Sequence, residues 1–132
     1  MKKFIITIVL ALVCMSSFAQ TYRFRSTDLA LGTRNSYGNI VWGKWERCRV
    51  LITIDFDNGY IKVYSEKEQN YVIIDAGENY VDRSGGSNID FTAIDEEGIE
   101  CDLRLRVQRD GTGQLYAFYS NIAWVYGGLN RL

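Results

Sequence analysis

Carboxylates are the side chains of this chain that could carry catalysis, because the sequence of 132 residues contains no histidine. The lack of histidine excludes Ser-His-Asp and Cys-His mechanisms and nearly all zinc chemistry. Asp55 and Asp57 share one face of an expected strand at a separation of about 7 Å, which an inverting glycosidase could use. The apolar residues Ile52, Ile54 and Phe56 occupy the opposite face, which places both carboxylates in water. A general acid needs a partly dry site, so we predict no catalytic residue and no enzymatic activity.

Six further acidic residues surround one expected turn and are the candidates for holding a metal ion. Calcium accepts carboxylate oxygens in flexible geometries, so such a cluster could form a weak surface site. A solvated acidic turn accounts for the same residues without any ligand, and we predict no metal and no cofactor. The residues are Asp90, Asp95, Glu96, Glu97, Glu100 and Asp102.

Cys48 and Cys101 are the two cysteines that follow the leader segment described below, and both share the parity of the apolar face of their expected strands. An even pair in an exported protein favours a disulfide, which would close a loop of about 54 residues and contribute about 4 kcal/mol. In an eight-stranded barrel, however, the two strands face each other across a ring about 15 Å wide, whereas a disulfide needs Cα atoms about 5.5 Å apart. A disulfide and two buried thiols both stay open as hypotheses.

Aromatic residues are the most unusual feature of the composition, with three tryptophans and nine tyrosines. These side chains are favoured at recognition surfaces because they combine a large contact area with a polar group, and they also fill the cores of small β-proteins. Trp42 and Trp45 are three residues apart, so either they face opposite ways on a regular strand or a bulge intervenes. We predict Trp42, Trp45, Trp124 and Tyr126 as contacts for a ligand or a protein partner.

The first nineteen residues are typical of a signal peptide. Two lysines precede the apolar run Phe4–Val13, and small residues stand at positions −3 and −1 of a cleavage point after Ala19. The run is much shorter than the roughly 20 apolar residues of a membrane-spanning helix. We therefore predict a signal peptide over 1–19, a single all-β domain over 20–132, and an exported protein that is periplasmic or secreted.

The charge of the predicted mature chain argues against a nucleic-acid partner. Residues 20–132 contain 13 basic and 16 acidic residues, so their net charge is −3 and they hold no polybasic run. Nucleic-acid binding usually requires a basic face, so we predict no nucleic-acid partner. We likewise predict no membrane association after signal cleavage.

Alternating apolar and polar residues predict strands along the mature chain. The pair Asn58-Gly59 fits a tight hairpin turn between two of them, and no stretch of ten residues keeps an apolar stripe of helical period. The segment from Ser26 to Ile40 is the least readable, and a bulged strand, a short helical turn and a long loop all stay open for it. The expected strands are Thr21–Ser26, Cys48–Asp57 with Trp42–Arg47 leading into it, Tyr60–Ser65, Tyr71–Gly77, Asn88–Asp95, Cys101–Arg109, Gln114–Ser120 and Ile122–Gly127.

The spacing of these strands, about 10 to 14 residues from centre to centre, is typical of an all-β barrel or sandwich. Short connections favour a small antiparallel up-and-down β-barrel of about eight strands, with a β-sandwich as the alternative. Closing the barrel removes its edges, so we expect the last strand, with Trp124 and Tyr126, to pair with the first near Tyr22 and Phe24.

The layout resembles a group of small secreted bacterial β-barrel proteins, domains of unknown function to which no activity is attached. The motifs that carry the resemblance are Gln20-Thr-Tyr22, Trp42-Gly-Lys-Trp45, Ile52-Thr-Ile-Asp55, Ile61-Lys-Val-Tyr-Ser65 and Trp124-Val-Tyr126. The chain is also loosely similar to calycin-type barrels such as lipocalins, which implies a small apolar ligand. It lacks their Gly-x-Trp motif near the start, and a barrel of 113 residues can be filled by its own side chains.

Three functions follow as hypotheses from these observations. The first is an exported, non-enzymatic β-barrel that binds a small ligand or a protein partner. The second is an inhibitor or immunity-type protein that inserts the loop Ser84–Asn88 into a hydrolase, since Asp82–Ser87 faintly resembles the Ser-Gly-rich loop of periplasmic lysozyme inhibitors. The third is a carboxylate-dependent hydrolase, which needs two acids facing one cleft.

Overall fold

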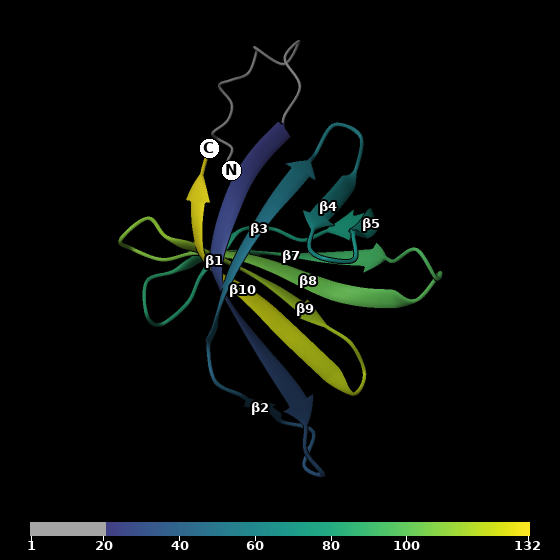
Figure 1. Ribbon diagram of the computed structural model, residues 1–132, viewed down its shortest axis with the longest axis vertical. Helices are drawn as coiled ribbons and strands as arrows, with labels where there is room; N and C mark the ends of the chain where they lie inside the picture. Colours follow the sequence, from purple (N-terminus) through teal and green to yellow (C-terminus); the bar gives the residue numbers. More distant parts are fainter. Residues whose placement is uncertain (1–20) are drawn as a thin grey trace.

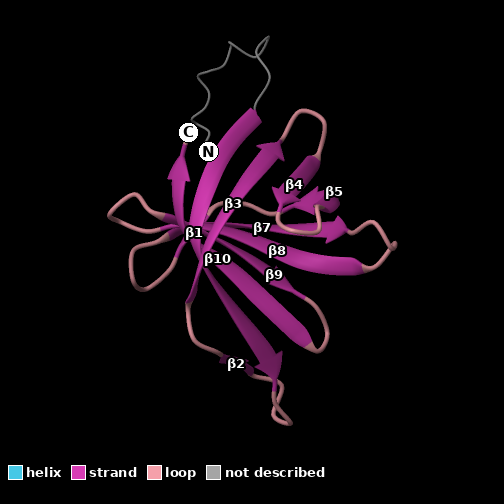
Figure 2. Ribbon diagram, in the orientation of Figure 1, coloured by secondary structure: helices cyan, strands magenta, loops and turns pink. Residues whose placement is uncertain are grey.

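A computed structural model describes residues 21–132, and the predicted signal peptide over 1–19 lies outside the described residues. All the regular elements of this range are strands (Figure 2). Between residues 21 and 132 there is no helix of the length and apolar character needed to cross a membrane.

Eight of the strands form a closed antiparallel barrel (Figure 1). Each of these strands pairs with the next one around the barrel, and the last pairs with the first, so the predicted up-and-down barrel is confirmed. The eight are β1 (Thr21–Arg34), β3 (Glu46–Asp55), β4 (Tyr60–Tyr64), β5 (Gln69–Ala76), β7 (Ser87–Ile94), β8 (Glu100–Val107), β9 (Gly113–Phe118) and β10 (Ile122–Arg131).

Two short strands, β2 (Ile40–Trp42) and β6 (Tyr80–Val81), extend the edges of neighbouring strands. β2 pairs with the same edge of β1 as β3 does, and the three residues 43–45 between them lie opposite only two residues of β1. β6 pairs with the same edge of β7 as β5 does, across the similar interruption 77–79. Each interruption adds one residue and works as a bulge, which changes the direction of the side chains that follow.

β1 is longer than the sequence pattern predicted. The strand expected over Thr21–Ser26 continues to Arg34, through the segment that had no readable pattern. Its pairing with β3 shifts register between Ser26 and Asp28, so the alternation of inward and outward residues breaks there. The longer strand also moves the closure of the barrel: Trp124 pairs with Leu31, much further along β1 than the predicted pairing near Tyr22 and Phe24.

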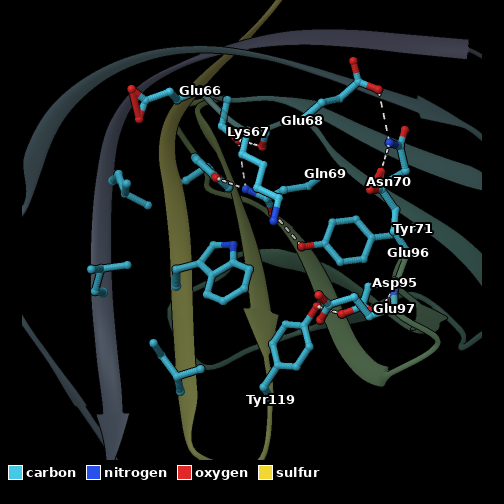
Figure 3. Close-up of a pocket in the computed structure, with 16 residues that line it drawn as sticks. Glu66, Lys67, Glu68, Gln69, Asn70, Tyr71, Asp95, Glu96, Glu97 and Tyr119 are labelled. Carbon is cyan, nitrogen blue, oxygen red and sulfur yellow. Dashed lines mark hydrogen bonds between the residues drawn. The ribbon is translucent and has the colours of Figure 1, made fainter.

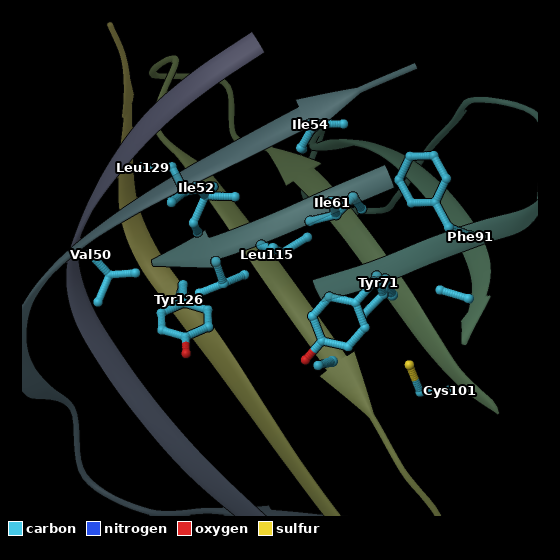
Figure 4. Packing of buried hydrophobic residues seen from close by; sticks show 14 residues of the cluster. Val50, Ile52, Ile54, Ile61, Tyr71, Phe91, Cys101, Leu115, Tyr126 and Leu129 are labelled. Atoms are coloured by element: carbon cyan, nitrogen blue, oxygen red, sulfur yellow. The ribbon is translucent and has the colours of Figure 1, made fainter. Parts of the chain in front are cut away.

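One cluster of buried hydrophobic residues runs through the barrel interior (Figure 4), and its half next to the β3–β4 turn holds large aliphatic and aromatic side chains. Ile52, Ile61 and Phe91 are fully buried in this half. Phe56, in the turn between β3 and β4, packs against Phe91 with ring centroids 5.9 Å apart and closes this end. We call it the packed end; the β4–β5, β7–β8 and β9–β10 turns surround the other end, which we call the open end.

Shortening one of the packed side chains tests this description. Ile52→Ala should lower the free energy of unfolding by about 3 kcal/mol, because it removes buried methyl groups and leaves a cavity. The neighbouring Leu51 points outward and is 42% exposed, so Leu51→Ala should cost less than about 0.5 kcal/mol. Urea denaturation followed by circular dichroism measures both. Equal losses in the two variants would contradict the assigned inward face of β3.

Candidate functional site

The open end of the barrel contains a pocket with a volume of about 520 Å³. This size lies within the range of small-molecule sites, roughly 300 to 1,000 Å³. We call it the mouth pocket. Its walls come from the start of β5, the first half of β10 and the middle of β1, together with the β4–β5, β7–β8 and β9–β10 turns. The inward side chains that line it are Leu29, Leu31, Gln69, Tyr71, Tyr119, Trp124 and Tyr126.

Three buried inward residues near the open end have short side chains. Ala93 on β7 and Cys101 on β8 are paired, and Ala117 on β9 is paired with Trp124 on β10. All three small residues are buried, and they occupy positions whose counterparts at the packed end are isoleucine, leucine and phenylalanine. Among the described residues, none of these three lines the mouth pocket, which is bordered by larger side chains such as Tyr71, Tyr119 and Trp124.

A hydrogen-bonded amide fixes the floor of the mouth pocket. The Tyr71 hydroxyl donates to Gln69 Oε1 at 2.6 Å, and Gln69 Nε2 donates to the Tyr126 hydroxyl at 2.9 Å and to Ser65 Oγ at 3.1 Å. Tyr71 and Tyr126 are both buried. Because one amide holds two phenols, the floor is preorganised and keeps its polar groups satisfied.

The wall beside this floor is an aromatic pair. The rings of Tyr119 and Trp124 stack with centroids 5.2 Å apart and an angle of 24° between planes. The Tyr119 hydroxyl donates to Asp95 Oδ2 at 2.9 Å, and Asp95 Oδ1 accepts the backbone amides of Glu97 and Ile99 at the same distance. Burial opposes ionisation of Asp95, but these hydrogen bonds outweigh it and keep the pKa of the carboxyl below its usual value.

The pocket keeps its phenols and its thiol uncharged. Burial raises the pKa of Tyr71, Tyr119 and Tyr126 above the usual value for a phenol. Burial also raises the pKa of the Cys101 thiol, so this group is not activated as a nucleophile. At neutral pH the buried phenols and the thiol beside the pocket are therefore uncharged.

The rim of the mouth pocket carries charge. Figure 3 shows Glu66, Lys67 and Glu68 in the turn between β4 and β5, and the acidic residues of the turn between β7 and β8 beside Tyr71 and Tyr119. The acidic cluster predicted from the sequence thus splits. Asp95, Glu96 and Glu97 line the pocket, whereas Asp90 and Asp102 line a separate hollow on the outside of β7 and β8.

Two of the four predicted contact residues, Trp124 and Tyr126, line the mouth pocket. Trp42 and Trp45 lie on the outside of the barrel, because the bulge between β2 and β3 removes the alternation that would separate them. A Cβ at Gly32 would come within 2.9 Å of the Trp42 ring, and one at Gly127 within 2.8 Å of the Trp45 ring. Glycine at both positions lets the two indoles lie flat on the strands β1 and β10.

Sequence reasoning did not single out Gln69, Tyr71 or Tyr119. The alternation of β5 carries a usable signal, because Gln69 and Tyr71 have the same parity and point inward together. Tyr119 follows the last residue of β9, where alternation no longer predicts a direction.

Both cysteines are free thiols in the structure. Cys48 lies on β3, with its sulfur 3.6 Å from the hydroxyl of Ser26, and Cys101 lies four strands away around the barrel on β8. The two sulfurs form no disulfide, and of the two thiols Cys101 is buried whereas Cys48 is partly exposed.

The prediction that Asp55 lies in water is wrong. It is 5% exposed, and its two oxygens accept hydrogen bonds at 3.0 Å from the backbone and the side-chain amide of Asn58. These bonds lower the pKa of Asp55, the side-chain amide having the larger effect. The carboxylate therefore holds the β3–β4 turn, while Asp57 is exposed. Within residues 21–132, no group of three or more cysteine or acidic side chains is arranged to hold a metal ion.

The loop Ser84–Asn88 is held against the packed end. Asp82 accepts two backbone amides from within this loop at 3.0 Å, and its other oxygen accepts a hydrogen bond from Arg106 Nε on β8 at 2.7 Å. The Arg106 guanidinium keeps the pKa of Asp82 well below its usual value. These bonds fix the backbone of the loop, while the side chains of Ser84 and Ser87 remain exposed.

No protein-family model, no curated protein and no solved structure matches this chain. A barrel fold by itself does not define a function, since related folds carry out unrelated tasks. The functional conclusion therefore rests on the side chains of the mouth pocket.

The buried phenols predict a loss of stability at alkaline pH. A phenol whose pKa is raised on folding stabilises the protein fully below the unfolded value of about 10, and this contribution is lost as the pH rises above it. Between about pH 9 and pH 11, Tyr119→Phe should therefore lose less stability than the wild type. Tyr37 is 87% exposed, so Tyr37→Phe should match the wild type. Urea denaturation across this pH range measures the difference, and identical slopes in all three proteins would contradict the raised pKa.

Proposed function

We propose that this protein is an exported, non-enzymatic binding protein that takes a small ligand into the mouth pocket. The observation that carries the proposal is the contrast between the two halves of the barrel. One half is filled by large aliphatic and aromatic side chains, while the other keeps a space of about 520 Å³ beside an aromatic wall. Leaving this space open forgoes packing energy that a filled barrel would gain, which favours a role for it.

The lining fits an apolar or aromatic ligand with a few polar groups. The stacked pair of Tyr119 and Trp124 offers flat surface, and the amide of Gln69 fixes the phenols at the floor. Leu31 and Ile122 stand exposed at the mouth, where they form an apolar lip. Binding sites for small molecules commonly combine such an apolar surface with a small number of fixed polar groups.

The ionised state of Asp95 in the pocket wall favours binding over hydrolysis as the function. Asp95 has a lowered pKa and already accepts three hydrogen bonds, so it is ionised and tied to its turn. A general acid requires the opposite, a raised pKa and a free proton. The chain also contains no histidine to serve as a general base. Export to the periplasm or the medium is proposed from the leader at 1–19.

A neutral fluorescent probe tests the proposal. N-phenyl-1-naphthylamine should bind the wild-type protein with increased emission, and Trp124→Leu should weaken binding at least about tenfold, which is about 1.4 kcal/mol. Trp45→Leu is the matched control, because Trp45 lies outside the barrel, and its affinity should equal that of the wild type. Fluorescence titration gives the dissociation constants.

A second variant tests the pocket independently, in case Trp124→Leu misfolds. Leu31 is exposed at the lip, so Leu31→Gln should fold normally and still weaken the probe several-fold. Circular dichroism confirms folding. Absence of binding to the wild type, or equal affinity in all variants, would refute the proposed pocket.

A further inference from the structure

The rim of the mouth pocket is strongly negative. Among residues 21–132, five carboxylates line it against a single ammonium group, that of Lys67. They belong to two separate turns, β4–β5 and β7–β8, which border different sides of the pocket. The five are Glu66, Glu68, Asp95, Glu96 and Glu97.

Little of this charge is neutralised inside the protein. Glu68 lies 3.9 Å from Lys62 Nζ on the outside of the sheet, and Glu96 accepts a hydrogen bond from the uncharged amide of Asn70. Among the described residues, the carboxylates of Glu66 and Glu97 form no hydrogen bond or ion pair. The rim therefore presents a negative potential to whatever approaches the pocket.

The aromatic wall below the rim also favours cations. The face of an aromatic ring is the negative side of its quadrupole and attracts cations, most strongly for tryptophan. Trp124 and Tyr119 form this wall, and the phenols of Tyr71 and Tyr126 at the floor are neutral. An organic cation could thus place its apolar body against the rings while its charge stays near the carboxylates.

We infer that the mouth pocket selects organic cations, that is, a quaternary or protonated amine carrying an apolar or aromatic group. This inference rests on the proposed function and adds the charge of the ligand to it. A bare metal ion does not fit, because the carboxylates stand on different turns and, within residues 21–132, do not converge as a coordination group. A large, diffuse cation needs no such convergence, since it is held by potential and by ring faces.

Two isosteric compounds test the charge directly. Phenyltrimethylammonium and tert-butylbenzene have the same shape and differ in charge, and benzenesulfonate adds an anion of similar size. Competition against N-phenyl-1-naphthylamine should show the cation binding at least about tenfold more tightly than the neutral compound, with the anion weakest. Raising the salt from about 0.05 M to about 0.5 M should weaken the cation several-fold and leave the neutral compound unchanged.

Variants of the charged rim residues test whether these residues cause the preference for cations. Glu66→Gln combined with Glu97→Gln should weaken phenyltrimethylammonium about five- to tenfold without changing the affinity for the neutral probe. Asp75→Asn combined with Glu78→Gln removes the same charge near the packed end and should change neither affinity. Lys67→Met removes the opposing charge and should strengthen binding of the cation.

The outcomes separate the two levels of the proposal. If tert-butylbenzene or benzenesulfonate binds as tightly as the cation, or if Lys67→Met weakens the cation, the charge preference is refuted while the binding function stands. If the neutral probe and all three compounds fail to bind the wild type, the proposed function falls as well.

Discussion

The pairing of β10 with β1 is the constraint on which the rest of the structure depends. Eight residue pairs join the two strands and leave the barrel without an open edge between them. Once the sheet is closed, every inward side chain must share one enclosed space, and the choice at each position is between filling that space and leaving it hollow. Ile52 and Phe91 fill it with large side chains, whereas Ala93 and Ala117 contribute short ones, and the mouth pocket lies beyond the buried cluster at the open end.

The sequence predicts which residues of a strand face inward only where apolar and polar residues alternate without a break. It survives along β3 and β8, whose inward residues are predicted correctly, and along β10, where it places Trp124 and Tyr126 in the pocket. It fails where a strand bulges, because one added residue reverses the faces that follow. For this reason β1 could not be read past Ser26, and the direction of Trp42 and Trp45 could not be settled. Alternation also cannot place residues in turns, so the association of the β4–β5 and β7–β8 turns around one rim becomes visible only in three dimensions.

The two ends of the barrel are held together by different interactions. At the packed end, hydrocarbon burial and the ion pair of Asp82 with Arg106 fix the turns. At the open end, polar groups are fixed by one another: Gln69 holds two phenols and Asp95 holds both its turn and Tyr119. Because these networks are complete, and no buried side-chain nitrogen or oxygen between residues 21 and 132 lacks a partner, the pocket can stay rigid without collapsing into the space beside it.

The closure of the barrel also sets when the mouth pocket forms during folding. Ser26 donates a hydrogen bond to the carbonyl of Gly127 at 2.8 Å, which joins positions 101 residues apart in the chain. Contacts between such distant positions form late in folding, since the intervening chain must first be ordered. Trp124 belongs to β10, so the aromatic wall of the mouth pocket is incomplete until this strand has docked against β1. A chain whose barrel is still open therefore has no complete mouth pocket.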